Sequence, residues 1–125
     1  MRCMMRKIKI TALDKLFSRF IRSRAKWTCE RCHTRYPPPT SALHCSHFHG
    51  RGKKSVRWDP SNAAALCFGC HLLFTGQPQQ HVEWFRARLG EEEFNALRDR
   101  ANSLAPMTQD RLALVKHWLS EVTDD

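Results

Sequence analysis

Two Cys-x2-Cys pairs constrain the fold of this 125-residue chain more than any other feature of its sequence. Cys29 and Cys32 form the first pair, and Cys67 and Cys70 form the second. Two such pairs can place four thiolates around one Zn²⁺ in a closed tetrahedral site, which is typical of small zinc-stabilised folds. We therefore predict a structural zinc site held by these four cysteines.

Disulfide bonds and redox chemistry are the alternatives for these cysteines. The basic N-terminus, residues 1–10, is not followed by the apolar segment of a secretory signal, so we expect a cytoplasmic protein. Thiols stay reduced in a bacterial cytosol, which disfavours disulfide bonds. A redox-active Cys-x2-Cys remains open for either pair alone, but the two pairs together favour zinc.

Positive charge is concentrated in the first half of the chain. Residues 1–60 contain 15 Lys and Arg and three Asp and Glu, a net charge of +12. Residues 61–125 contain six Lys and Arg and nine Asp and Glu, a net charge of −3, so the whole chain has a formal net charge of +9. Lys and Arg release counterions when they neutralise phosphates, so this surface favours a nucleic acid as the partner. A basic surface that serves only solubility is the alternative. No apolar run reaches the roughly 18 residues of a membrane span, so we expect no membrane partner.

The length of the chain predicts one compact domain with three parts. Residues 1–26 form a basic arm and an amphipathic helix over 11–26, in which apolar residues recur every three or four positions. Residues 27–76 form the cysteine-containing core, and residues 77–125 form a helical tail. We class the fold as small α+β.

Within the core, the pattern predicts a β-hairpin followed by a helix. A strand is expected over 42–49, a glycine-containing turn over 51–54 and a return strand over 55–58. A short helix is expected to begin at Cys70. The tail is expected to contain three helices, over 79–89, 91–104 and 108–122.

Two histidines and an asparagine are arranged around the cysteine pairs. His47 and Asn62 lie between the pairs, and His71 directly follows the second pair. The order Cys-x2-Cys, His, Asn, Cys-x2-Cys-His resembles that of the HNH nuclease family, also called ββα-metal or His-Me finger endonucleases. The stretch from Pro60 to His71 reads P-x-N-x4-C-x2-C-H and is similar to the zinc-containing members of that family.

Parts of residues 29–74 resemble a more specific group within this family. Ser46 to His49, Arg57 to Asn62 and the second cysteine pair resemble phage recombination nucleases of the lambda NinG (Rap) type, and more distantly the endonuclease VII type of phage T4. This resemblance implies a ββα-metal unit on a treble-clef-like zinc scaffold, flanked by a basic N-terminal helix and a C-terminal helical tail. It also implies a phage-encoded, metal-dependent endonuclease that hydrolyses phosphodiester bonds in branched or recombination-intermediate DNA.

The resemblance assigns catalytic roles to the two histidines and the asparagine. His47 would be the general base that takes a proton from water, because an imidazole titrates near neutral pH. Asn62 would hold His47 in position, directly or through the backbone of its loop. His71 would bind a catalytic Mg²⁺ or Mn²⁺ ion. Ser46 stands where most of the family has a metal-binding Asp or His, so the cation needs a second ligand.

Three residues are candidates for that second ligand. His49 is the first, because strand alternation places positions 47 and 49 on one face. Asp59 and His44 are the others, and loss of activity is the remaining alternative. Basic side chains would bind the phosphates that flank the cut. The expected DNA contacts are Arg51, Lys53, Lys54 and Arg57 in the hairpin region and Arg19, Arg22 and Lys26 in the N-terminal helix.

Two other functions are alternatives, and the first of them shares the zinc site and the basic surface with the enzyme. One is a zinc-dependent module that binds DNA without cutting it, and the other is a phage packaging adaptor. His47, Asn62 and His71 favour the enzyme, because a binding module has no need of them. Symmetric cleavage of a four-way junction would need two active sites, so the resemblance also makes a homodimer attractive. The helices over 11–26 and 108–122 could form its interface.

Overall fold

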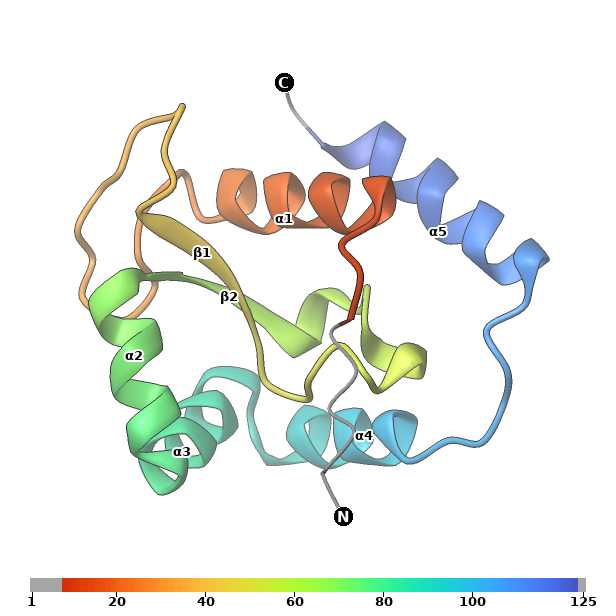
Figure 1. Cartoon of the computed structure of the whole chain (residues 1–125). Coiled ribbons are helices and arrows are strands. Elements are labelled where there is room, and N and C mark those ends of the chain that lie inside the picture. Colours follow the sequence, from red (N-terminus) through yellow and green to blue (C-terminus); the bar gives the residue numbers. More distant parts are fainter. Residues whose placement is uncertain (1–7, 124–125) are drawn as a thin grey trace, which may run out of the picture.

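The computed structural model describes residues 8–123 and places a two-stranded sheet among helices (Figure 1). Strand β1 (Leu43–His47) pairs antiparallel with strand β2 (Ala63–Cys67), with Leu43 opposite Cys67 and His47 opposite Ala63. The α-helices of the described chain are α1 (Ala12–Arg24), α2 (Phe68–Gly76), α3 (Pro78–Leu89), α4 (Glu91–Ala101) and α5 (Gln109–Val122). This arrangement confirms the small α+β class.

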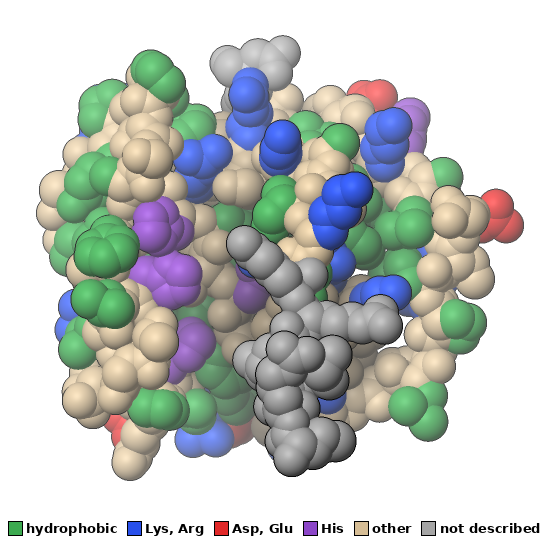
Figure 2. Space-filling view, viewed as in Figure 1, with side chains coloured by type: hydrophobic (Ala, Val, Ile, Leu, Met, Phe, Trp, Pro, Cys, Tyr) green, Lys and Arg blue, Asp and Glu red, His purple; other side chains and the backbone are tan. Residues whose placement is uncertain are grey.

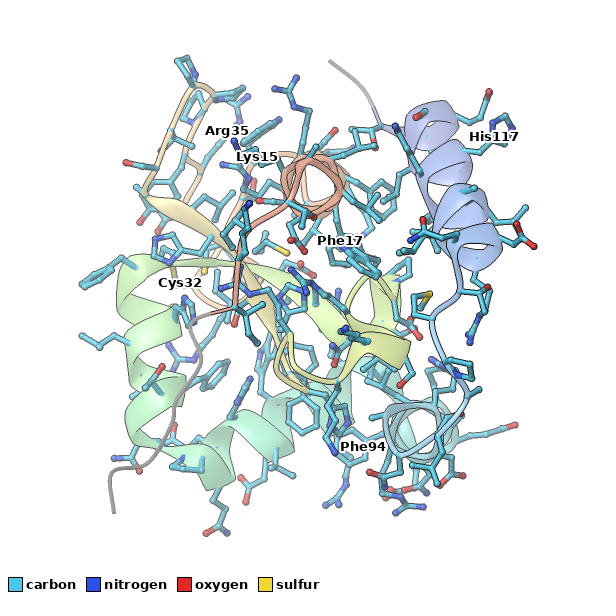
Figure 3. The ribbon with its side chains drawn as sticks, turned by 45° about the vertical axis from the view of Figure 1, so that its right-hand side comes forward. Lys15, Phe17, Cys32, Arg35, Phe94 and His117 are labelled. Carbon is cyan, nitrogen blue, oxygen red and sulfur yellow. The ribbon has the colours of Figure 1, made fainter. Side chains whose placement is uncertain are left out.

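Helix α1 begins with a capping box and packs its apolar face on the sheet. The Thr11 hydroxyl accepts a hydrogen bond from the Asp14 backbone N–H, and the Asp14 carboxylate accepts one from the Thr11 N–H. Phe17 and Ile21, four residues apart on one helix face, are buried. Figure 3 shows Phe17 on the side of α1 that faces the sheet. The expected amphipathic helix is confirmed, and its C-terminal end lies at Arg24.

Strand β2 is buried along its whole length and forms the centre of the core. Three consecutive alanines, residues 63–65, allow the neighbouring elements to approach its backbone closely. Its outer edge is also closed: the Glu30 N–H donates to the Ala65 carbonyl at 2.8 Å, and the Glu30 carboxylate accepts from the Ala65 N–H at 2.7 Å. Arg24 donates to the Ala63 carbonyl at 3.0 Å. The first cysteine pair, which flanks Glu30, is therefore tied to the strand that leads to the second.

The return strand lies later in the chain than the sequence pattern predicted. The structure places it at Ala63–Cys67, whereas the segment expected to be a strand, 55–58, begins inside a 3₁₀ turn at Lys54–Val56 and continues as a turn. Val56 is buried against α4, and the Arg57 and Trp58 side chains both bond to α1. These contacts hold the segment in tight turns, so it cannot join the β ladder.

The remaining element boundaries differ from the expected ones by a few residues. β1 ends at His47 rather than at 49, and α4 ends at Ala101 rather than at 104. α2 begins at Phe68, two residues earlier than expected, because the Cys67 sulfur accepts from the Cys70 N–H as an N-cap. Helices α3 and α5 agree with the predicted ranges within one residue. None of the helices in residues 8–123 is both long enough and apolar enough to span a membrane.

Candidate functional site

The four paired cysteines converge, as the spacing predicted. Their sulfur atoms all lie within 4.8 Å of one another, and the Sγ atoms of Cys32 and Cys67 are 3.8 Å apart. A tetrahedral zinc ion with Zn–S bonds of about 2.3 Å would separate its sulfur ligands by roughly 3.8 Å. The cluster therefore has the donor set and the size to hold a metal ion such as zinc. Cys45 lies outside it.

Backbone N–H groups and one arginine surround this cluster. The Cys32 N–H points at the Cys29 sulfur and the Cys70 N–H at the Cys67 sulfur, each at 3.5 Å. Arg31 donates to the Cys70 sulfur, also at 3.5 Å. Such donors stabilise negative charge on thiolates. In Figure 3, Cys32 lies next to the start of α2, so the cluster joins the first cysteine turn to that helix.

His71 immediately follows this cluster in the chain and pairs with a histidine of the sheet. The Nδ1 atoms of His71 and His44 are 3.0 Å apart, the distance of a hydrogen bond between the two rings, and the rings meet edge to face. Two ligands of an octahedral cation with bonds of about 2.1 Å are separated by roughly 3.0 Å when they occupy adjacent positions. Of the three candidates for the second metal ligand, His44 is the one that the structure brings to His71.

A hydrogen bond to a backbone carbonyl orients the imidazole ring of His47. Its Nε2 atom lies 2.9 Å from the carbonyl oxygen of Arg57. Because a carbonyl oxygen only accepts, this bond makes Nε2 the protonated nitrogen of the neutral ring and Nδ1 the basic one. Burial lowers the pKa of His47 below its usual value; the Arg57 carbonyl and Asp14 oppose this, and the positive charges of Arg51 and Arg57 add to it.

A basic hollow of about 410 Å³ opens beside the His47 ring, between β1 and α1. Four of its lining side chains are basic, and its one carboxylate, Asp14, is already paired with Arg57. Lys and Arg side chains gather over α1 on this side of the molecule (Figure 2), and Figure 3 labels Lys15 there. The hollow is lined by Ile10, Asp14, Lys15, Ser18, Arg19, Arg22, Cys45, His47 and Arg51.

Asn62 is fully buried and clamps the loop that follows β1. Its Oδ1 atom accepts from the His49 N–H at 2.8 Å, and its Nδ2 group donates to the carbonyls of His49 at 2.8 Å and Val56 at 3.1 Å. The structure shows no hydrogen bond between Asn62 and the described His47 ring. Of the two routes considered, the contacts of the Asn62 side chain follow the one through the backbone of the loop.

Arg57 lies in a different environment from the one expected of a phosphate-binding residue. Arg57 is 7% exposed, and its guanidinium donates from Nε to Asp14 Oδ1 at 2.9 Å and to the Lys9 carbonyl at 2.9 Å. Trp58 donates to the same carboxylate at 3.0 Å. Burial raises the pKa of Asp14, but the bonds from Arg57 and Thr11 outweigh it and lower that pKa to about 2. This geometry gives Arg57 a structural role.

Asp14, which lines the hollow and binds Arg57, is a residue that the sequence reasoning missed. A signal for it existed, because Asp14 is the single acidic residue among the first 29 and lies within a basic helix. Its partners are 43 and 44 positions away in the chain, so their identity required the fold.

The other expected DNA contacts lie on the surface or partly bury their charge. Lys26, Lys53, Lys54 and Arg19 are exposed, whereas Arg22 is half-buried and donates to the Thr40 carbonyl at 3.2 Å. The structure does not bring His49 to His71. The His49 ring packs on Phe48, and its buried Nε2 atom has no hydrogen-bond partner within the described chain.

The proposed base and the histidine pair lie on opposite faces of β1. His44 and His47 are three residues apart in a regular strand, so their side chains point in opposite directions. Their contacts agree, since the His44 ring meets His71 of α2 and the His47 ring packs against Phe17 of α1. A ligand that reaches both groups would have to cross the edge of β1.

Comparisons with family models, with curated proteins and with solved structures find no match to this chain.

Proposed function

We propose that this protein is a divalent-metal-dependent DNA endonuclease of the HNH type, built on a zinc scaffold. The observation that carries the proposal is His47, whose Nε2 atom is tied to a backbone carbonyl while its ring borders a hollow with four basic side chains. A neutral, oriented imidazole beside a phosphate-binding surface is what the hydrolysis of a phosphodiester needs from a protein.

In the proposed reaction, Nδ1 of His47 accepts a proton from water. The water oxygen then bonds to phosphorus as the bond from phosphorus to the leaving 3′ oxygen breaks. The lowered pKa of His47 keeps the ring neutral and able to accept a proton at physiological pH. Asn62 fixes the loop after His47, and Lys15, Arg19 and Arg51 bind the phosphates.

A divalent cation completes this proposal. His44 and His71 would hold Mg²⁺ or Mn²⁺, because their Nδ1 atoms have the separation of two adjacent ligands. When bound, the cation would stabilise negative charge on the scissile phosphate and on the leaving oxygen. Water and phosphate oxygens would supply the remaining ligands, as they do in many magnesium sites.

The order of elements supports the choice of scaffold. A cysteine turn, a β-hairpin and a helix with a cysteine in its first turn follow one another, and this is the order of a treble clef. We propose zinc as its metal, because four thiolates suit zinc better than harder cations. Three further parts of the proposal rest on the sequence resemblance. The substrate is branched or recombination-intermediate DNA, the location is the bacterial host cytoplasm, and the protein forms a homodimer.

A second function, DNA binding without cleavage, is favoured by one observation. His47 and the histidine pair are on opposite faces of β1, so the base and the cation share no hollow in this structure. A basic zinc domain could bind DNA through α1 without using either group.

Cleavage assays separate the two functions. Supercoiled plasmid, a four-way junction and a flap should each be incubated with the full chain, with Mg²⁺, with Mn²⁺ and with no added divalent cation. We expect cleavage of at least one DNA that requires the cation. His47→Ala should lower the rate by about 10² to 10⁴ without weakening binding, whereas His117→Ala, on the exposed side of α5, should not. Binding with no cleavage under any condition would leave the non-catalytic function.

A further inference from the structure

Helix α2 exposes two large apolar side chains and carries no Lys, Arg, Asp or Glu of its own. Phe68 is 60% exposed and Leu72 is 58% exposed, although the helix buries Cys70 and Phe74 on its other side. The helix sequence, FGCHLLFTG, contains no Lys, Arg, Asp or Glu, while the whole chain has 33 such residues. Phe68 and Leu72 are thus not needed to fill the core. No charged side chain of their helix would hinder the contact of a flat apolar ligand with them.

These side chains share one face of α2 with the proposed cation ligand. Residues 68, 71, 72 and 75 recur at helical spacing, and together with His44 they line a shallow hollow of about 220 Å³. The Phe68 ring lies 6.0 Å from the His44 ring, and the His44 ring lies 5.2 Å from that of His71. Figure 2 shows histidine and hydrophobic side chains side by side over α2.

The neighbouring groups decide which ligand this face suits. A phosphate bound to the proposed cation at His44 and His71 would carry its nucleoside with it, and Phe68 and Leu72 next to these histidines offer a ring and an aliphatic side chain. Nucleobases stack on aromatic side chains, and apolar side chains can insert between bases. A base in intact duplex DNA is already stacked on both sides, so this surface suits a base that has been freed.

We infer that Phe68 and Leu72 form a nucleobase-binding surface that receives an unpaired or unstacked base next to the cation site proposed at His44 and His71. This inference rests on the proposed function. The surface would give the protein a preference for DNA with open bases, such as single strands, flaps and junction centres, over continuous duplex. Specificity would then come from the local state of the bases rather than from their sequence.

Fluorescence of 2-aminopurine tests this directly, because stacking quenches it. The full chain is titrated into a single-stranded oligonucleotide containing the probe, and into its duplex, without added divalent cation so that no cleavage occurs. We expect quenching of the single strand by the wild type. Phe68→Ala should weaken single-strand binding about tenfold, with a smaller loss for Leu72→Ala, and change duplex binding less than twofold.

Three further variants and measurements control the result. Phe68→Trp keeps a stacking surface and should retain quenching. Leu114→Ala removes an apolar side chain that is 70% exposed on α5, and should have no effect. Thermal unfolding shows that each variant is folded. Wild-type affinity in folded Phe68→Ala and Leu72→Ala would overturn the inference.

The remaining outcomes also distinguish the surface from the enzyme. A change of oligomeric state in Phe68→Ala, measured by sedimentation, would make this face a protein contact and overturn the inference. Unchanged quenching by the variants, together with cation-dependent cleavage, would remove the base-binding surface and leave the nuclease. Quenching that depends on Phe68 in a protein that never cleaves DNA would support the surface and remove the nuclease.

Discussion

The Nε2 atom of His47 lies 2.9 Å from the carbonyl oxygen of Arg57, the residue whose side chain is buried against Asp14. The backbone of Arg57 thereby orients the proposed base, while its guanidinium anchors that backbone to α1. One residue connects an ion pair in the core to an imidazole beside the basic hollow. The first three predictions test this connection and the groups around it.

Cleavage should depend on the neutral form of His47. Burial lowers the pKa of His47 below its usual value of about 6.5, and Arg51 and Arg57 lower it further while Asp14 and the bond to the Arg57 carbonyl oppose this. The pH at which half of the imidazole is neutral therefore lies below 6.5. We expect kcat/KM to be flat through neutral pH and to fall with unit slope in acid. Stopped assays across pH 5 to 8 measure it.

The variant Arg51→Gln tests whether the acid limb of the pH profile follows the pKa of His47. Removal of this positive charge should raise the pKa of His47 and move the acid limb to higher pH. Arg35→Gln, at an exposed site beyond the first cysteine turn, should leave the limb in place. A wild-type limb centred above pH 7 would contradict the assignment of His47 as the base.

Asp14→Asn should destabilise the fold by about 3 kcal/mol, because it leaves the buried Arg57 guanidinium without its counter-charge. Urea unfolding at pH 7 measures this, and Asp99→Asn, which breaks an exposed pair with Arg98, should cost less than about 1 kcal/mol. Equal losses in the free energy of unfolding for the two variants would show that the buried ion pair stabilises the fold no more than the exposed one.

The same carboxylate predicts a dependence of stability on acid pH. The pKa of Asp14 is lowered from 3.8 to about 2, so the folded state binds the proton more weakly than the unfolded state. The pair therefore contributes about 2 kcal/mol above pH 4, and this contribution is lost as the pH falls through 2. In Asp14→Asn this part of the acid destabilisation should be missing.

Asn62→Asp should lower both stability and cleavage. The substitution removes the amide donor to the carbonyls of His49 and Val56 and places a carboxylate against them, inside the core. We expect a loss of about 2–3 kcal/mol in the free energy of unfolding. Asn102→Asp, at an exposed position after α4, is the control and should be nearly neutral. A folded Asn62→Asp with full activity would remove the positioning role.

Loss of one proposed cation ligand should weaken the binding of the cation, so that more cation is needed for cleavage. His44→Ala and His71→Ala should each raise the Mn²⁺ concentration for half-maximal cleavage at least about tenfold. His49→Ala should not, because His49 lies apart from the pair. If His49→Ala alone shifts the metal dependence, the ligand assignment is wrong.

Metal analysis of the purified protein should find about one zinc per chain. Cys29→Ser should lose the metal and the cooperative thermal transition, because the cluster joins the first cysteine turn to α2. Cys45→Ala should keep both, since the Cys45 thiol lies outside the cluster and burial raises its pKa to about 12. A cooperatively folded protein without zinc would refute the scaffold.

Features encoded by local spacing could be predicted from the sequence. The cysteine cluster follows from two short pairs, and α1 follows from the Thr11 cap and the apolar repeat. The segment over 55–58 alternates polar and apolar residues like a strand, but it forms turns because Arg57 and Trp58 bond to a carboxylate more than 40 positions away. The pairing of His44 with His71 likewise depends on the register of β1 and β2, which spacing alone does not determine.

Cys70 and His71 are consecutive residues in the first turn of α2, so the thiolate cluster and the histidine pair are one peptide bond apart. Thiolates lose zinc when they are oxidised, and Cys32 is exposed to oxidants. Under the proposed function, oxidative release of the zinc would free the helix start that holds His71 opposite His44. DNA cleavage by this protein would then follow the thiol redox state of the cell and stop under oxidative stress.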